Sequence, residues 1–191
     1  NKFKVEATLE DIKIPYRETI KKSVTQRTRF KKQSGGHGQF GEVEITFEPT
    51  HNYDESYVFD EKVFGGAVPK SYFPAVEKGL AESVKSGVLA GYPVLGIKAT
   101  LVDGSYHTVD SSEMAFKTAT MMCFKEAIPK ASPALLEPYM KMKVIVDEAY
   151  TGDIMSNFNT KRARVIGSDV LSDGLIKIVA EAPMREVMNY A

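Results

Sequence analysis

Two segments of alternating side chains flank a loop with four glycines, and this arrangement restricts the fold more than any other feature. The first segment, 24–32, places basic side chains on one face: Arg27, Arg29 and Lys31. The second, 42–48, has Val43, Ile45 and Phe47 on one face and Glu42, Glu44 and Glu48 on the other. A period of two predicts strands, and glycines between two strands predict a hairpin. Basic and acidic side chains can then pair across it.

Charge is uneven along this hairpin. No acidic residue lies between Glu18 and Glu42, whereas six Lys or Arg do. A basic strand that ends in a glycine-rich loop suits contact with phosphate-rich surfaces. The whole chain has 25 Lys plus Arg and 25 Asp plus Glu, so we expect a focal contact with nucleic acid. A plain flexible hairpin loop fits the same residues.

Composition predicts an ordinary soluble protein, because 43% apolar residues can bury one large core or two small ones. The single Cys123 forms no intramolecular disulfide, and no apolar run approaches the ~20 residues of a membrane span. We expect a cytoplasmic monomer without a membrane partner. The chain starts without Met and ends inside a predicted helix, so we expect a piece of a longer protein.

The pattern predicts an α+β protein with two domains, 1–132 and 133–191. In the first domain, strands are expected at 2–8 and 94–101, with Asp103-Gly104 as the turn that ends the latter. Helices are expected from Ser71, as its cap, and from the capping-box spacing of Asp110 and Glu113.

The second domain restarts the pattern after Lys130-Ala131-Ser132-Pro133. A strand at 140–146 precedes a helix capped within Thr151-Gly152-Asp153, strands at 163–167 and 175–182, and a helix starting near Pro183. This order is most of a split βαββαβ unit without its last strand, which would leave apolar surface uncovered.

Catalytic and metal chemistry find no support in the sequence. The glycine loop is followed by a strand and lacks GxxxxGK[ST], so it is not a P-loop. His37, His51 and His107 lack metal-ligand spacing. Asp110 and Ser111 are expected as helix caps. His107 is either a solvated loop residue or a group that holds a phosphate or ribose of a partner.

Five segments resemble translation elongation factor G. They are Tyr16-Arg17-Glu18-Thr19-Ile20, the glycine loop 33–41, Phe64-Gly65-Gly66-Ala67-Val68-Pro69, the run 103–113 that contains Ser105-Tyr106-His107, and 148–153. Essentially the whole chain is similar to domain IV and an incomplete domain V of that ribosomal translocase. The resemblance implies an elongated βαβ-type domain, a two-layer α/β sandwich like those of ribosomal proteins, followed by a truncated ferredoxin-like βαββα domain.

The resemblance also implies a tip of two loops that enters the decoding region of the small ribosomal subunit. Its expected partners are the ribosome, small-subunit rRNA and the tRNA–mRNA duplex. His107 aligns with the family's tip histidine, which is modified in eukaryotic relatives. The expected RNA-contacting residues are Gln33, Ser34, Gly35, Gly36, His37, Gly38, Gln39, His107, Ser111 and Ser112, with supporting charge from Arg27, Arg29, Lys31 and Lys32.

The implied activity is tRNA–mRNA translocation by a parent GTPase that uses GTP and Mg, with no catalytic, cofactor or metal residue in this chain. His37 stands where the family commonly has arginine, and 159–164 departs from the usual turn, which suggests a divergent paralogue. Ribosome recycling and tetracycline protection are therefore alternatives, although Ser-Tyr-His favours the translocase branch. A stand-alone RNA-binding module is a further alternative, and a small-molecule enzyme ranks last.

Overall fold

The computed structural model describes residues 12–190, so the strand expected at 2–8 lies outside the described residues. The described chain forms two compact units, one of Tyr16–Leu136 and the other of residues 12–15 with 137–190. The sequence favoured a boundary between residues 132 and 133. Strand β6 (Pro133–Leu136) pairs antiparallel with β1 (Arg17–Ile20), and its contacts group these four residues with the first unit.

A four-stranded sheet forms one layer of the first unit. Its order is β2-β3-β5-β4, formed by β2 (Val24–Ser34), β3 (His37–Pro49), β5 (Ile97–Ser105) and β4 (Tyr57–Glu61). The two central pairings are antiparallel, and β4 runs parallel to β5. Helix α1 (Phe73–Ser83) connects these parallel strands, as a crossover requires.

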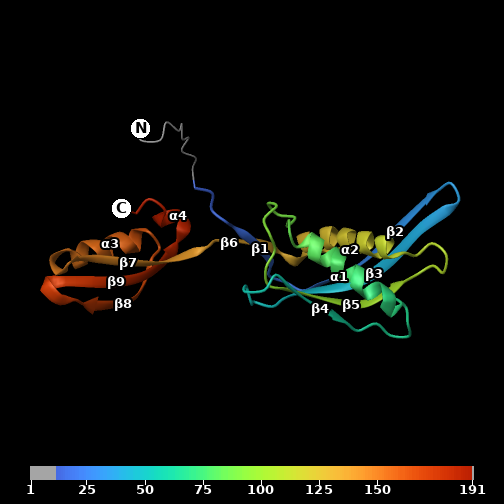
Figure 1. Cartoon of the computed structure of the whole chain (residues 1–191), viewed down its shortest axis with the longest axis horizontal. Helices are drawn as coiled ribbons and strands as arrows, with labels where there is room; N and C mark the ends of the chain where they lie inside the picture. Colours follow the sequence, from blue (N-terminus) through green and yellow to red (C-terminus); the bar gives the residue numbers. More distant parts are fainter. Residues whose placement is uncertain (1–11, 191) are drawn as a thin grey trace, which may run out of the picture. The chain divides into compact units, whose positions relative to one another are not determined.

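Helices α1 and α2 (Glu113–Ala127) pack side by side over one face of this sheet and form the second layer (Figure 1). The core between the layers is apolar and includes Phe47, Leu80, Leu101, Phe116 and Phe124. The predicted two-layer α+β sandwich is therefore confirmed. Cys123 is buried here, and burial raises the pKa of its thiol to about 12.

The predicted hairpin is confirmed as β2 and β3. Arg27 lies opposite Glu44 and Arg29 opposite Glu42, so basic and acidic side chains face each other across the pair. The turn itself consists of Gly35 and Gly36, whose φ values are +60° and +116°. Two-residue hairpin turns need such positive φ values, which glycine adopts without strain.

The expected end of the 94–101 strand was wrong. Strand β5 begins at Ile97 and continues through Asp103 and Gly104 to Ser105, with a register shift opposite Glu44 and Ile45. Gly104 lies directly against the carbonyl oxygen of Glu42 on β3, where no side chain would fit. This glycine therefore permits close approach of two strands rather than a turn.

Two expected helix caps were also wrong. Helix α1 follows the 3-10 turn η1 (Lys70–Tyr72) with Tyr72 as N-cap and Pro74 in its first turn, so Ser71 lies inside η1. Proline suits this place because the first-turn N–H groups have no partner within the helix. Helix α3 (Thr151–Thr160) has Tyr150 as its N-cap, and no side chain caps it.

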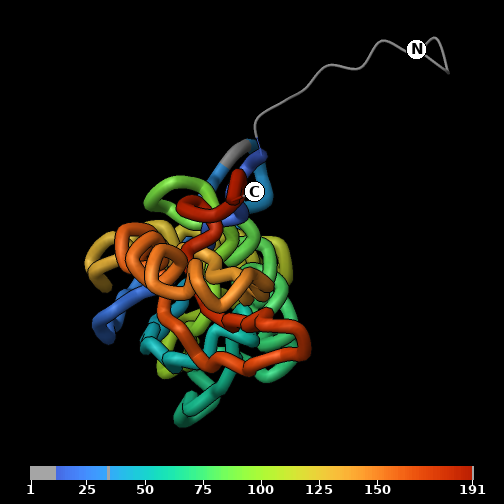
Figure 2. Tube along the Cα trace, turned by 90° about the vertical axis from the view of Figure 1, so that its left-hand side faces the viewer, coloured from blue at the N-terminus to red at the C-terminus, as the bar shows by residue number. Residues whose placement is uncertain are grey.

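The second unit contains β7 (Tyr139–Asp147), α3, β8 (Arg164–Val170), β9 (Leu175–Pro183) and α4 (Met184–Val187). The sheet order is β7-β9-β8, with β9 antiparallel to both neighbours. Helix α3 lies over one face of this sheet (Figure 1 and Figure 2). Its Phe158 packs against Ile176, Ile178 and Ala180. The split βαββα order expected from the sequence is confirmed.

Candidate nucleic-acid interface

The two loops that the sequence singled out meet at one end of the first unit. Phe40 N donates to Asp110 O at 2.8 Å, and Ser111 Oγ donates to Phe40 O at 2.9 Å. Gly38 N donates to the Asp110 carboxylate at 3.1 Å. Because backbone and side chains both take part, the loops form a single tip rather than two separate arms.

A cavity of about 160 Å³ lies between the loops. Its lining comes from both of them: Lys31, Lys32, Gln33, Gly38, Gln39, Phe40, His107 and Asp110. A Cβ on Gly38 would lie 2.6 Å from an Asp110 carboxylate oxygen, so glycine allows the close approach of the loops. The tip therefore presents two lysines and a histidine beside exposed backbone.

His107 is held by its own loop. Its Nδ1 accepts from the N–H groups of Val109, at 3.3 Å, and Asp110, at 3.1 Å. Nδ1 also lies 3.5 Å from Asp110 Oδ2, but an ion pair would need a proton on the atom that two N–H groups already face. We therefore place the proton on Nε2. The side chain is 54% exposed, so Nε2 can donate to a partner.

Asp110 and Ser111 do not cap helix α2, which corrects the sequence-based expectation. The N-cap is Ser112, whose Oγ accepts from Ala115 N at 3.1 Å. Ser111 Oγ instead accepts from His107 N at 2.9 Å while it donates to Phe40. Both serines expected at the interface thus have structural roles, and their contact with a partner stays a prediction.

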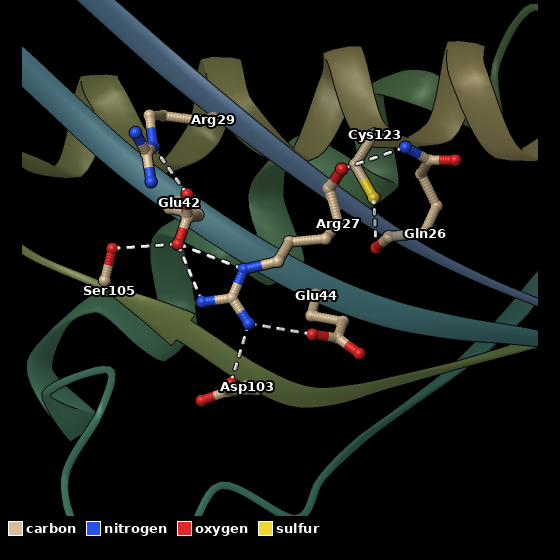
Figure 3. Close-up of polar contacts among 8 residues, drawn as sticks. All are labelled: Gln26, Arg27, Arg29, Glu42, Glu44, Asp103, Ser105 and Cys123. Carbon is tan, nitrogen blue, oxygen red and sulfur yellow. Dashed lines mark hydrogen bonds and ion pairs between the residues drawn. The ribbon is translucent and has the colours of Figure 1, made fainter.

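Arg27 and Arg29, expected to supply charge, are bound within the sheet (Figure 3). The Glu42 carboxylate accepts from Arg27 Nη2 at 2.7 Å and from Arg29 Nε at 2.6 Å. Its further donor is Ser105 Oγ at 3.0 Å, on β5. Arg27 Nη1 also contacts Glu44 at 2.9 Å and Asp103 at 2.8 Å. Arg27 therefore has a structural task, and most of its charge is compensated.

The pKa shifts in this network follow from its contacts. Burial raises the pKa of Glu42, but the hydrogen bonds from Arg27, Arg29 and Ser105 outweigh burial and leave it below its usual value. The hydrogen bond from Arg27 likewise lowers the pKa of Asp103. Both carboxylates are therefore ionised at neutral pH.

Uncompensated positive charge at the tip comes from Lys31 and Lys32. Both are exposed, and neither forms an ion pair within residues 12–190. His37, Gln33 and Gln39 are exposed beside them. The structure thus brings together most of the expected tip residues. It adds Phe40 and Asp110, which the sequence did not assign to the interface.

Glu18 is another residue whose role the sequence did not reveal. It is buried, with 1% of its surface exposed, and its carboxylate accepts from the N–H groups of Leu89, Ala90 and Tyr92 at 2.7–3.0 Å. A Cβ on Gly87 would collide with this carboxylate. Glu18 therefore holds the loop after α1 in place. Gly87 beside this loop is the sequence feature from which that role could have been predicted.

Two negative findings apply to the part of the chain that the structure describes. No group of three or more His, Cys, Asp or Glu side chains within it is arranged to hold a metal ion. None of its helices has the length and apolar character needed to cross a membrane.

Comparison with known proteins agrees with this architecture. The family model "Elongation factor G, domain IV" matches residues 12–132, and "Elongation factor G C-terminus" matches 134–191. A crystal structure of a protein from Thermus thermophilus is 42% identical, covers 94% of this chain and superposes with a TM-score of 0.85. The chain spans 26% of that protein's length.

The fold and the tip thus define a two-domain piece of a translation factor. The chain belongs to the elongation factor G family, which confirms the resemblance inferred from its sequence segments. Its first unit corresponds to domain IV and its second to the C-terminal domain.

Proposed function

We propose that this chain is the ribosome-contacting arm of a translational GTPase and promotes tRNA–mRNA translocation. Its tip enters the decoding region of the small subunit and contacts the tRNA–mRNA duplex, with small-subunit rRNA around it. The observation that supports this proposal is the joining of both loops into one tip that exposes Lys31, Lys32 and His107. GTP and Mg bind elsewhere in the parent protein.

The tip works through shape and hydrogen bonding rather than through bond making. Lysines contact phosphates, while the Nε2–H of His107 and exposed backbone amides contact phosphate or ribose oxygens. Such contacts depend on salt and hardly on codon sequence. A tip seated in this way prevents the tRNA from moving back.

The test is His107→Asn in the full-length factor. An asparagine side chain can still accept from backbone N–H groups two residues on, so the loop keeps its conformation while the Nε2–H donor is lost. We expect single-turnover translocation to slow by about tenfold, because losing roughly one charge-assisted hydrogen bond has an effect of this size. GTP hydrolysis should be unchanged.

The matched control is His51→Asn. His51 follows β3 at the end of the sheet far from the tip, and its φ of +58° suits asparagine. Equal translocation rates for the His107 variant and the wild type would contradict the proposed role. A factor that splits ribosomes but does not translocate would favour recycling.

A further inference from the structure

A third loop leaves the first unit at the same end as the tip. Strand β4 runs parallel to β5, so the segment after Glu61 emerges where β5 delivers the His107 loop (Figure 1). Lys62 N donates to Leu101 O at 2.8 Å at its start. Tyr72 OH donates to Ser111 O at 3.3 Å at its end. The loop 62–72 is thus attached to the tip itself.

This loop holds one aromatic side chain in solvent. Val68 is buried against Gly104, whereas Phe64 is 87% exposed. Ala67 N donates to Phe64 O at 3.3 Å, and the turn between them needs Gly65 and Gly66 at φ values of +64° and +71°. Single exposed apolar residues are common. Here, however, a tight turn anchored in the core keeps a phenylalanine outward.

The surroundings of Phe64 suit RNA. Lys62 and Lys70 are exposed and lie in the same loop, two and six residues from Phe64 in the chain, and no acidic residue occurs from 62 to 76. Nothing lies within 4 Å of where a side chain on Gly65 or Gly66 would begin, so a flat ligand can approach. An exposed aromatic ring in a loop of lysines and glycines resembles a stacking platform for bases.

We propose that Phe64 stacks on an unpaired RNA base while Lys62 and Lys70 contact the adjoining phosphates. The loop 62–72 thereby forms a third RNA-contacting element of the tip. This inference rests on the proposed function, because it assigns that tip an additional contact. Stacking on any base is possible, so the contact adds affinity without reading sequence.

The chain contains no tryptophan, so Phe64→Trp introduces a single fluorescent reporter at the site. It is titrated at low salt with a ten-nucleotide oligoadenylate and with an abasic ribose-phosphate strand of the same length. We expect quenching by the oligoadenylate and none by the abasic strand. Phe64→Ala should bind labelled oligoadenylate about tenfold more weakly, as expected for loss of one stacked base. Phe64→Trp should bind like the wild type.

The matched control is Leu89→Trp, at a half-exposed apolar residue in the loop before β5, far from the tip. It should show no quenching. If the wild type binds RNA but the fluorescence of Phe64→Trp is not quenched, this inference is overturned and the tip proposal stays intact. A Phe64→Ala variant that binds RNA normally but no longer binds the ribosome would also overturn the inference. Phe64 would then contact a protein surface. Absence of RNA binding would overturn the inference as well, while the translocation assay judges the proposed function separately.

Discussion

At the residue scale, Glu42 connects three strands. Its side chain is 6% exposed and takes hydrogen bonds from Arg27 and Arg29 on β2 and from Ser105 on β5. Breaking a buried ionic contact is costly, because the remaining groups lose their partner without regaining full hydration. Glu42 therefore supports the strands that present both tip loops.

The variant Glu42→Gln should lower the free energy of unfolding by about 2 kcal/mol, since the amide keeps the volume but loses the charge. Urea denaturation at neutral pH measures the change. Glu44→Gln is the control, because Glu44 is more exposed and, among residues 12–190, accepts a side-chain hydrogen bond from Arg27 alone. Its effect should stay below about 1 kcal/mol. Equal effects of the two substitutions would show that burial of Glu42 is unimportant.

The stabilisation that Glu42 provides should also depend on pH. The folded-state pKa of Glu42 lies below its ordinary value of 4.5, so its stabilisation is present above that value and is lost as the pH falls through the lowered pKa. The difference in unfolding free energy between wild type and Glu42→Gln should therefore shrink between pH ~5 and ~2. A difference that stays constant over this range would argue against the shift.

At the element scale, the hairpin depends on glycines for different reasons. A Cβ on Gly38 would meet the Asp110 carboxylate, which can move. A Cβ on Gly41 would lie 2.9 Å from the backbone of Ala115 in the first turn of α2, which cannot move without displacing the helix. Gly41 thus sets how closely the hairpin packs on α2.

We expect Gly41→Ala to lower the free energy of unfolding by about 1–3 kcal/mol, the usual range for overpacking. Gly38→Ala, on the same strand, should cost less in stability but loosen the 106–112 loop. Urea denaturation and amide hydrogen exchange distinguish these effects. A Gly41 variant as stable as the wild type would mean that hairpin and helix can separate without cost.

At the scale of the whole molecule, positive and negative charges balance, so the proposed attraction to RNA has to come from particular places on the surface. The sequence has a formal net charge of zero, and Arg27 is compensated by Glu42, Glu44 and Asp103. Lys31 and Lys32 remain exposed and available for the proposed contact with phosphates. Binding to RNA should therefore depend on salt through a few lysines rather than through the whole surface.

The double variant Lys31→Ala/Lys32→Ala should reduce the slope of log affinity against log salt by about 1.4, since each phosphate contact on single-stranded RNA contributes about 0.7. Anisotropy titrations of the labelled oligoadenylate at several salt concentrations measure it. Lys141→Ala/Lys143→Ala, at exposed positions of β7, is the control and should leave the slope unchanged. Equal slopes for wild type and the tip variant would place the RNA contact elsewhere.

The sequence by itself determined the hairpin, the two covering helices and the order of elements in the second unit. Alternation and helical spacing depend on residues close together in the chain, so local patterns suffice. The resemblance to elongation factor G, which rests on short segments, also identified the family.

Only the tertiary structure decided the roles of individual polar residues. Asp110 looks like a helix cap until Gly38, 72 residues away, donates to it. In the sequence, Arg27 looks available to a partner, but in the structure it forms an ion pair with Asp103 on β5. Glu18 has no evident role in the sequence, but its carboxylate accepts a hydrogen bond from the loop at Leu89. A polar group binds whichever partner the fold places within hydrogen-bond distance, and these partners are remote in the chain.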